Sequence, residues 1–119
     1  MYYIDFNAIT DEHLEGEWRV HNRTFNRSDV ESIFAKAEKH SFLKDGVFKL
    51  SPSDVIGQWS IKRNDDLVRR PFLSFEVGSE KAEALITRLS YTPDKSKCQL
   101  NIYFSTGLEL VLLKELVKD

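Results

Sequence analysis

Apolar and polar residues alternate along most of the chain, which is the pattern of β-strands with one buried face. In the C-terminal half, small or apolar residues alternate with more polar neighbours, namely at Cys98, Leu100, Ile102 and Phe104. Comparable segments predict strands at 16–25, 55–63, 72–77, 82–91 and 108–116. Within 82–91 we expect Leu85, Leu89 and Tyr91 on one face and Ile86 on the other.

Turn-forming residues separate these strands at short intervals. Asp45-Gly46 can supply the positive φ angles of a tight hairpin turn between Phe42 and Phe48. Further breaks fall at Ser51–Asp54, Asn64–Asp66, Gly78-Ser79, Thr92–Lys97 and Thr106-Gly107. Short connections of this kind are typical of neighbouring antiparallel strands.

A helical period appears in one segment, Ser28 to His40. Its first four residues form a capping box, in which the Ser28 hydroxyl accepts a hydrogen bond from the Glu31 amide. Apolar residues follow at the spacing of one helix face, at Val30, Ile33, Phe34 and Ala37. Positive charge in the last turns complements the helix dipole, at Lys36, Lys39 and His40. We therefore expect one α-helix after the first strand, and a single helical turn at Thr10–His13.

About eight strands joined by short turns predict a mainly β fold, an antiparallel up-and-down barrel that forms one domain over residues 1–119. The apolar N-terminal residues are expected to pack across one end of the barrel, namely Tyr2, Tyr3, Ile4 and Phe6. A two-sheet sandwich of the same strands is the alternative, but hairpin connections favour the barrel. A barrel of this size has room inside for its own side chains or for one small ligand.

Charge and composition argue against several classes of function. The formal net charge of −2 argues against a general nucleic-acid binder, which needs a positive excess to displace counterions from phosphates. Cys98 is the single cysteine, so neither an internal disulfide nor a thiolate metal cluster can form. Because we see no leader-like run and no apolar span of membrane length, we expect a cytoplasmic protein without a transmembrane segment, although removal of a leader would leave the same sequence.

Two Gly-x-Trp elements occur near the start of predicted strands, at Gly16 to Trp18 and at Gly57 to Trp59. In each, the glycine can permit a bend or a close approach of the backbone, and the tryptophan can cap an end of the core. With their surroundings they resemble the small bacterial lipocalin-like domains of the calycin group. The matching segments are Leu14 to Val20, Phe42 to Phe48, Gly57 to Ile61, Ile86 to Tyr91 and Leu108 to Leu116.

The resemblance implies a closed β-barrel and, less directly, a small ligand inside it. The chain departs from the lipocalin pattern in its last strand, which offers Lys114 where lipocalins place an arginine across the first-strand tryptophan. It also lacks the arginine and tyrosine pair with which intracellular fatty-acid binders hold a carboxylate. The resemblance therefore implies the barrel more strongly than any particular ligand.

The apolar strand faces are where a ligand would bind. We expect a cavity able to accept a flat or acyl compound, lined by Phe34, Ile61, Phe75, Leu89 and Ile102. The alternative is that the same side chains fill the barrel completely. A basic cluster is a second candidate site, for an anionic headgroup or an acidic protein surface, and consists of Lys62, Arg63, Arg69 and Arg70.

No constellation of catalytic residues stands out in the sequence. His13, His21 and His40 lie far apart in the predicted structure, so we expect solvated imidazoles rather than a metal site. Cys98 belongs to an alternating apolar series and is expected to be a core residue rather than a nucleophile. We expect neither enzyme activity nor a metal or cofactor.

Two functions remain open. The first is a non-enzymatic binding protein that holds a small hydrophobic or amphipathic ligand in the barrel. The alternative is a small intracellular protein-binding module, such as a bacterial toxin-neutralising immunity protein, that acts through its surface.

Overall fold

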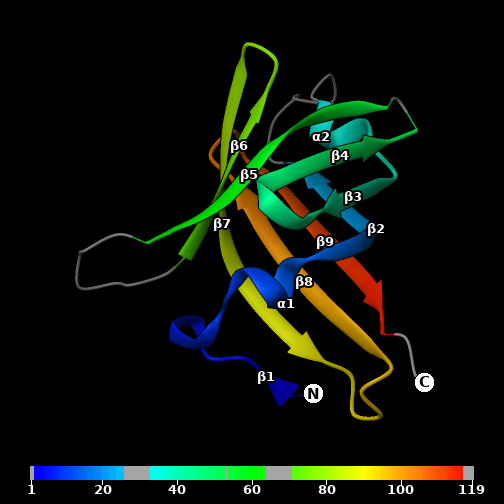
Figure 1. Cartoon of the computed structure of the whole chain (residues 1–119). Helices are drawn as coiled ribbons and strands as arrows, with labels where there is room; N and C mark the ends of the chain where they lie inside the picture. The colour runs from blue at the N-terminus through cyan, green and yellow to red at the C-terminus, as the bar shows by residue number, and fades with distance from the viewer. Residues whose placement is uncertain (1, 26–32, 53, 64–70, 117–119) are drawn as a thin grey trace.

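Eight antiparallel strands close into an up-and-down barrel in the computed structural model of this chain (Figure 1). The structure describes residues 2–25, 33–52, 54–63 and 71–116. The barrel strands are β2 (Gly16–Phe25), β3 (Lys39–Phe42), β4 (Val47–Ser51), β5 (Val55–Arg63), β6 (Pro71–Val77), β7 (Glu80–Tyr91), β8 (Lys97–Phe104) and β9 (Leu108–Glu115). Each strand pairs with the next, and β9 returns to pair with β2. The predicted barrel is confirmed, and its closure rules out the two-sheet sandwich.

Short helical elements lie at opposite ends of this barrel (Figure 1). Near the N-terminus, η1 (Phe6–Ala8) and α1 (Asp11–Leu14) cross one end, which we call the α1 end. The other end is covered by α2 (Ile33–Lys36), in the connection from β2 to β3, and we call it the α2 end. The helical turn predicted next to His13 is confirmed as α1.

The hairpin from β3 to β4 forms as the sequence predicts. Asp45 and Gly46 have φ angles of 62° and 75°, and lie in the short helical turn η2 (Lys44–Gly46). Both angles belong to the left-handed region, which glycine and aspartate tolerate better than most residues. The turn sets the register in which Phe42 lies opposite Phe48.

The predicted helix is too long at its C-terminal end. In the structure α2 ends at Lys36, and Lys39 and His40 already belong to β3. His40 lies opposite Trp18 on one side and Leu50 on the other, so its segment is a strand paired on both edges. These tertiary contacts outweigh the local helical preference of Lys39 and His40. The predicted capping box at 28–31 lies outside the described residues.

A β-bulge changes the predicted faces of β7. The register with β8 shifts between Ile86 and Arg88, which adds one residue to β7 at this point. A bulge of this kind moves the following residues to the opposite face. Ile86 and Leu89 are therefore both buried, whereas Leu85 is only partly buried, and the predicted division of this strand is wrong.

The N-terminal residues also differ in part from the prediction. Ile4 and Phe6 contact the core as expected. Tyr2 and Tyr3 instead form the short strand β1 (Tyr2–Tyr3), which pairs with the end of β7 beside the barrel. Their rings are 56% and 64% exposed, so these two residues do not cap the core.

Candidate functional site

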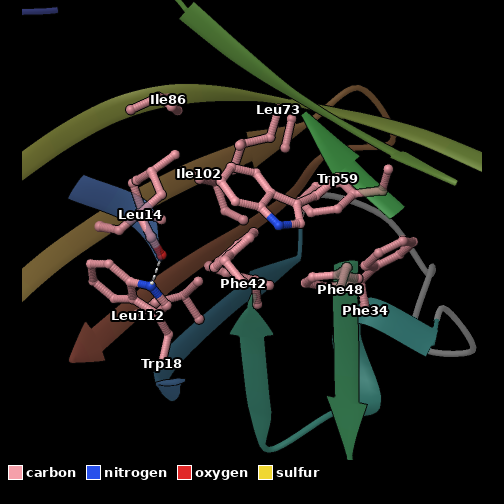
Figure 2. Packing of buried hydrophobic residues seen from close by; sticks show 14 of the residues in the cluster. Leu14, Trp18, Phe34, Phe42, Phe48, Trp59, Leu73, Ile86, Ile102 and Leu112 are labelled. Carbon is pink, nitrogen blue, oxygen red and sulfur yellow. Dashed lines mark hydrogen bonds between the residues drawn. The ribbon is translucent and has the colours of Figure 1, made fainter. Parts of the chain in front are cut away.

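Aromatic rings fill the barrel interior at the α2 end. Phe34 points inward from α2, and its ring centroid lies 6.2 Å from that of Phe48, 5.2 Å from that of Phe75 and 5.2 Å from that of Phe104. These three partners come from β4, β6 and β8, on different sides of the barrel. Figure 2 shows Phe34 beside Phe48 in the buried cluster. The Phe34 ring therefore closes the interior at this end like a plug.

The aromatic cluster continues toward the middle of the barrel. Phe48 and Phe75 lie 4.8 Å apart between ring centroids, and Phe42 lies 5.2 Å from Phe48. Trp59 meets Phe42 edge to face at 5.2 Å. Contacts at these separations are favourable beyond their simple burial of area.

The helix that positions Phe34 is held by Arg23. Arg23 of β2 donates from Nε to the Ala35 carbonyl at 2.6 Å and from Nη2 to the Ala37 carbonyl at 2.9 Å. Ala35 and Ala37 are themselves buried. Two hydrogen bonds from a charged donor fix the backbone of α2 against β2, while the Phe34 side chain is held by apolar contacts.

A buried histidine lies beside the plug. The His40 side chain is completely inaccessible to solvent, and its ring centroid lies 5.7 Å from Phe48 and 6.5 Å from Phe34. Its Nε2 lies 3.3 Å from the Phe34 carbonyl oxygen, and its Nδ1 has no hydrogen-bond partner among the described residues. Desolvation lowers the pKa of His40 to about 4, and the nearby Arg23 charge acts in the same direction. The prediction of a solvated side chain is wrong for His40.

The α1 end is closed differently, by polar groups that find partners. Trp18 is fully buried and donates from Nε1 to the Leu14 carbonyl at 2.8 Å (Figure 2). Lys114 of β9 places Nζ 4.7 Å from the centre of the Trp18 ring and donates at 2.9 Å to the carbonyls of both His13 and Glu15. This lysine thus crosses the first-strand tryptophan where the lipocalin pattern has an arginine.

The two Gly-x-Trp elements solve different steric problems. Gly16 has a φ of +132°, and a Cβ there would come within 2.8 Å of the Lys114 Cδ. At Gly57 a Cβ would lie 2.3 Å from the Glu76 carbonyl oxygen, because β5 and β6 approach closely there. Trp59 donates to the Leu43 carbonyl at 2.9 Å, outside its own strand. Gly16 is therefore needed for its positive φ, and Gly57 for the close approach of the neighbouring backbone.

The two described members of the predicted basic cluster, Lys62 and Arg63, have different surroundings. Arg63 donates to the Phe6 carbonyl at 2.9 Å and to the Ile9 carbonyl, so its guanidinium holds the N-terminal segment. Lys62 is exposed and lines a groove of about 370 Å³ on the outside of the barrel. Arg69 and Arg70 lie outside the described residues. Binding of an anion or an acidic partner by this cluster stays a prediction.

The predicted cavity residues all contact the core, but they do not form one patch. Phe34 and Phe75 touch each other, and Ile102 is buried in the same cluster. Leu89 lies past the bulge, and its carbonyl accepts a hydrogen bond from the Ile4 amide at 2.8 Å, on the N-terminal side of the barrel. Ile61 is only partly buried, opposite Leu73. Their role in ligand binding stays a prediction.

Three residues beside Phe34 were not included in the predicted site: His40, Phe48 and Phe104. For His40 the sequence does contain a signal, because His40 and Phe42 alternate with Lys39 and Ser41 as strand residues do. The predicted helix through His40 obscured this alternation. Phe48 and Phe104 were assigned to strands but not to the plugged end, because sequence alone does not say which strands meet around α2.

Cys98 lies in the core, as expected. Burial raises the pKa of its thiol to about 11, while the Lys114 charge opposes the rise, so the thiol is protonated near neutral pH. Across the ranges that the structure describes, no three histidine, cysteine, aspartate or glutamate side chains are grouped so that they could hold a metal ion.

Comparison with other proteins adds no family assignment. No model of a protein family matches the sequence, and neither a curated protein nor a solved structure matches the chain. Within the described residues, no helix has the length and apolar character needed to cross a membrane. The geometry of the antiparallel barrel is consistent with a calycin-like fold, and no family or relative identifies it as a lipocalin.

Proposed function

We propose that this protein is a non-enzymatic, lipocalin-like binding protein that holds a small amphipathic molecule at the α2 end of its barrel. The observation that supports the proposal is the position of one aromatic ring, that of Phe34 on α2, over the interior at this end. Beneath the ring lie further aromatic side chains rather than a polar network. A flat or acyl group of similar size can replace the Phe34 ring without exposing polar groups to an apolar surface.

Binding at the α2 end would exchange the Phe34 ring for the apolar part of a ligand. Removing a buried phenylalanine side chain costs about 3–5 kcal/mol, mostly lost burial and an unfilled cavity. A ligand that fills the same space recovers most of that cost. Hydrogen bonds from Arg23 hold the backbone at Ala35 and Ala37, so this backbone can stay in place when the Phe34 ring is exchanged.

Two observations support a binding role rather than catalysis. The Cys98 thiol is protonated near neutral pH and buried, which makes it a poor nucleophile. The Lys114 ammonium is committed to two backbone carbonyls over the Trp18 ring. Neither group is free to act as an acid or base toward a molecule at the α2 end.

The test is a titration of the purified chain with 1-octanol and p-cresol, followed by NMR of the aliphatic methyl groups and by calorimetry. We expect saturable shifts at interior methyls such as those of Ile102 and Leu110. Phe34→Ala enlarges the space at the α2 end and should tighten p-cresol binding about tenfold or more, since engineered cavities of roughly 150 Å³ lined by apolar side chains bind benzene.

The matched control is Ile56→Ala, which truncates a side chain that is 65% exposed on the outside of the barrel. It should bind the probes as the unmodified protein does. Absence of interior shifts in both the unmodified and the Phe34→Ala protein would contradict the proposal.

A second candidate function is a protein-binding module that acts through the outer face of the barrel. The observation in its favour is the outer groove along β5 and β6, where Ser60 lies opposite Ser74 between longer side chains. The groove is lined by Asp45, Gly46, Gln58, Trp59, Ser60, Lys62, Ser74, Glu76 and Lys81. A toxin-neutralising role predicts that Ser74→Arg blocks a partner, whereas Phe34→Ala does not. Pull-down with both variants distinguishes this function from the first.

A further inference from the structure

His40 is a polar residue at a fully buried position in the barrel. It lies on β3 opposite Trp18 and Leu50, both of which are fully buried. Phe34 and Phe48 cover its ring from the α2 end. A polar atom that is buried without a partner destabilises the fold, and most such atoms in proteins are paired.

The hydrogen bond on the other nitrogen identifies the tautomer. The Phe34 carbonyl oxygen can only accept, so the Nε2 atom 3.3 Å away carries the hydrogen and donates it. In the neutral imidazole the Nδ1 atom then holds a lone pair and can only accept. With its pKa lowered to about 4 by desolvation, His40 is neutral at physiological pH.

Phe34 contributes both the ring that closes the α2 end and the carbonyl that accepts the hydrogen bond from His40 Nε2. Arg23 holds the carbonyls of Ala35 and Ala37, so the backbone that follows Phe34 is fixed by contacts that do not involve the Phe34 ring. A change of rotamer at Phe34 therefore opens space beside the imidazole and leaves the Nε2 bond in place. Aromatic rings and the His40 imidazole lie around the Phe34 ring, and the Nδ1 of this imidazole has no hydrogen-bond partner among the described residues.

We propose that His40 Nδ1 is the polar anchor of the ligand site and restricts the ligand to neutral molecules that offer an O–H or N–H donor, such as alcohols, phenols and indoles. This inference rests on the proposed function. A carboxylate is excluded because it has no proton to donate and would place its charge beside a lone pair in an apolar interior. A ligand without a donor leaves Nδ1 unpaired and gains only apolar contacts.

The test compares three probes that share one ring: p-cresol, toluene and p-toluate. With the unmodified protein and with Phe34→Ala, p-cresol should bind about tenfold tighter than toluene, as expected for one neutral hydrogen bond to a buried acceptor. Binding of p-toluate should be roughly a hundredfold weaker than that of p-cresol. In His40→Leu, and in the double variant with Phe34→Ala, toluene should bind at least as tightly as p-cresol.

A second measurement uses only the unmodified protein, so its result does not depend on whether a variant folds. The ¹⁵N chemical shift of Nδ1 in the unmodified protein should move to a lower value only with p-cresol, because the nitrogen then accepts a hydrogen bond, and should stay constant with toluene. Binding of toluene or p-toluate at least as tight as that of p-cresol would overturn the His40 assignment while leaving the proposed function in place. Failure of all three probes to bind either the unmodified or the Phe34→Ala protein would overturn both.

Discussion

The two ends of this barrel are closed by different kinds of interaction. At the α1 end, Trp18 and Lys114 donate hydrogen bonds to the backbone carbonyls of the segment that covers the core. At the α2 end, the closing side chain is Phe34, whose ring packs on Phe75 and Phe104, and the neighbouring His40 has a ring nitrogen without a hydrogen-bond partner among the described residues. The α1 end is therefore closed by directional hydrogen bonds whose donors all have acceptors. The α2 end is closed by packing of apolar rings.

This difference between the two ends leads us to expect that the α1 end contributes mainly to stability and the α2 end to the proposed binding. Hydrogen bonds to backbone carbonyls are lost if the covering segment moves, so the α1 end is expected to open only on global unfolding. Apolar contacts around Phe34 can be replaced by another apolar group of similar shape, because dispersion and burial have no strict direction. We therefore expect the α2 end to exchange its contents without loss of the fold.

The largest predicted effect tests this difference by truncation at each end. Trp18→Ala should lower the free energy of unfolding by about 4 kcal/mol, within the range for large buried aromatics, and should not improve binding of p-cresol. Phe34→Ala should cost about 3 kcal/mol and should improve binding. Urea denaturation of both variants, with and without p-cresol, measures both quantities. Equal stabilisation of the two variants by p-cresol would contradict the comparison.

The next effect concerns pH and His40. The pKa of His40 is about 4 in the folded state and about 6.5 when unfolded, so the unfolded chain binds the additional proton as the pH falls between these values. The full stability is present above pH 6.5 and is lost progressively below it, and the loss amounts to about 3 kcal/mol by pH 4. His40→Leu should lack this loss, whereas Ile56→Leu, on the exposed surface, should keep it. Parallel pH profiles for His40→Leu and the unmodified chain would show that His40 is not buried and neutral.

A smaller effect is predicted at the α1 end. Lys114→Met keeps the aliphatic contact with Trp18 but leaves the His13 and Glu15 carbonyls without their donor, and should cost about 2 kcal/mol. Lys114→Arg restores a donor across the tryptophan and should recover at least half of that loss. The control is Lys81→Met, since the Lys81 side chain is 80% exposed in its ion pair with Glu76. It should change the free energy of unfolding by less than about 0.5 kcal/mol. A comparable loss in Lys81→Met would show that the Lys114 contacts have no special weight.

Local sequence patterns predicted most of this architecture. The alternation from Cys98 to Phe104, the Asp45-Gly46 turn and the meander order all depend on interactions between close neighbours in sequence or on adjacent strands. Two errors have a non-local cause. Pairing with β2 and β4 converts the predicted helix end at His40 into a strand, and a bulge after Ile86 reverses the faces of β7.

The candidate site was predicted less completely than the fold. Helical spacing identified Phe34 as an inward-facing residue, and strand alternation did the same for Phe75. Neither pattern shows that these rings meet, because α2, β6 and β8 come together only when the barrel closes. His40 was missed for the same reason: its burial and its unpaired nitrogen are consequences of the closed barrel and not of its neighbours in sequence.

The most direct test of the exchangeable α2 end is a nuclear Overhauser measurement on the unmodified protein saturated with p-cresol. The account predicts contacts from the ring protons of p-cresol to those of Phe75 and Phe104, together with a changed side-chain rotamer at Phe34. Contacts confined to outer residues such as Ser60 and Ser74, with Phe34 unchanged against Phe75, would contradict it.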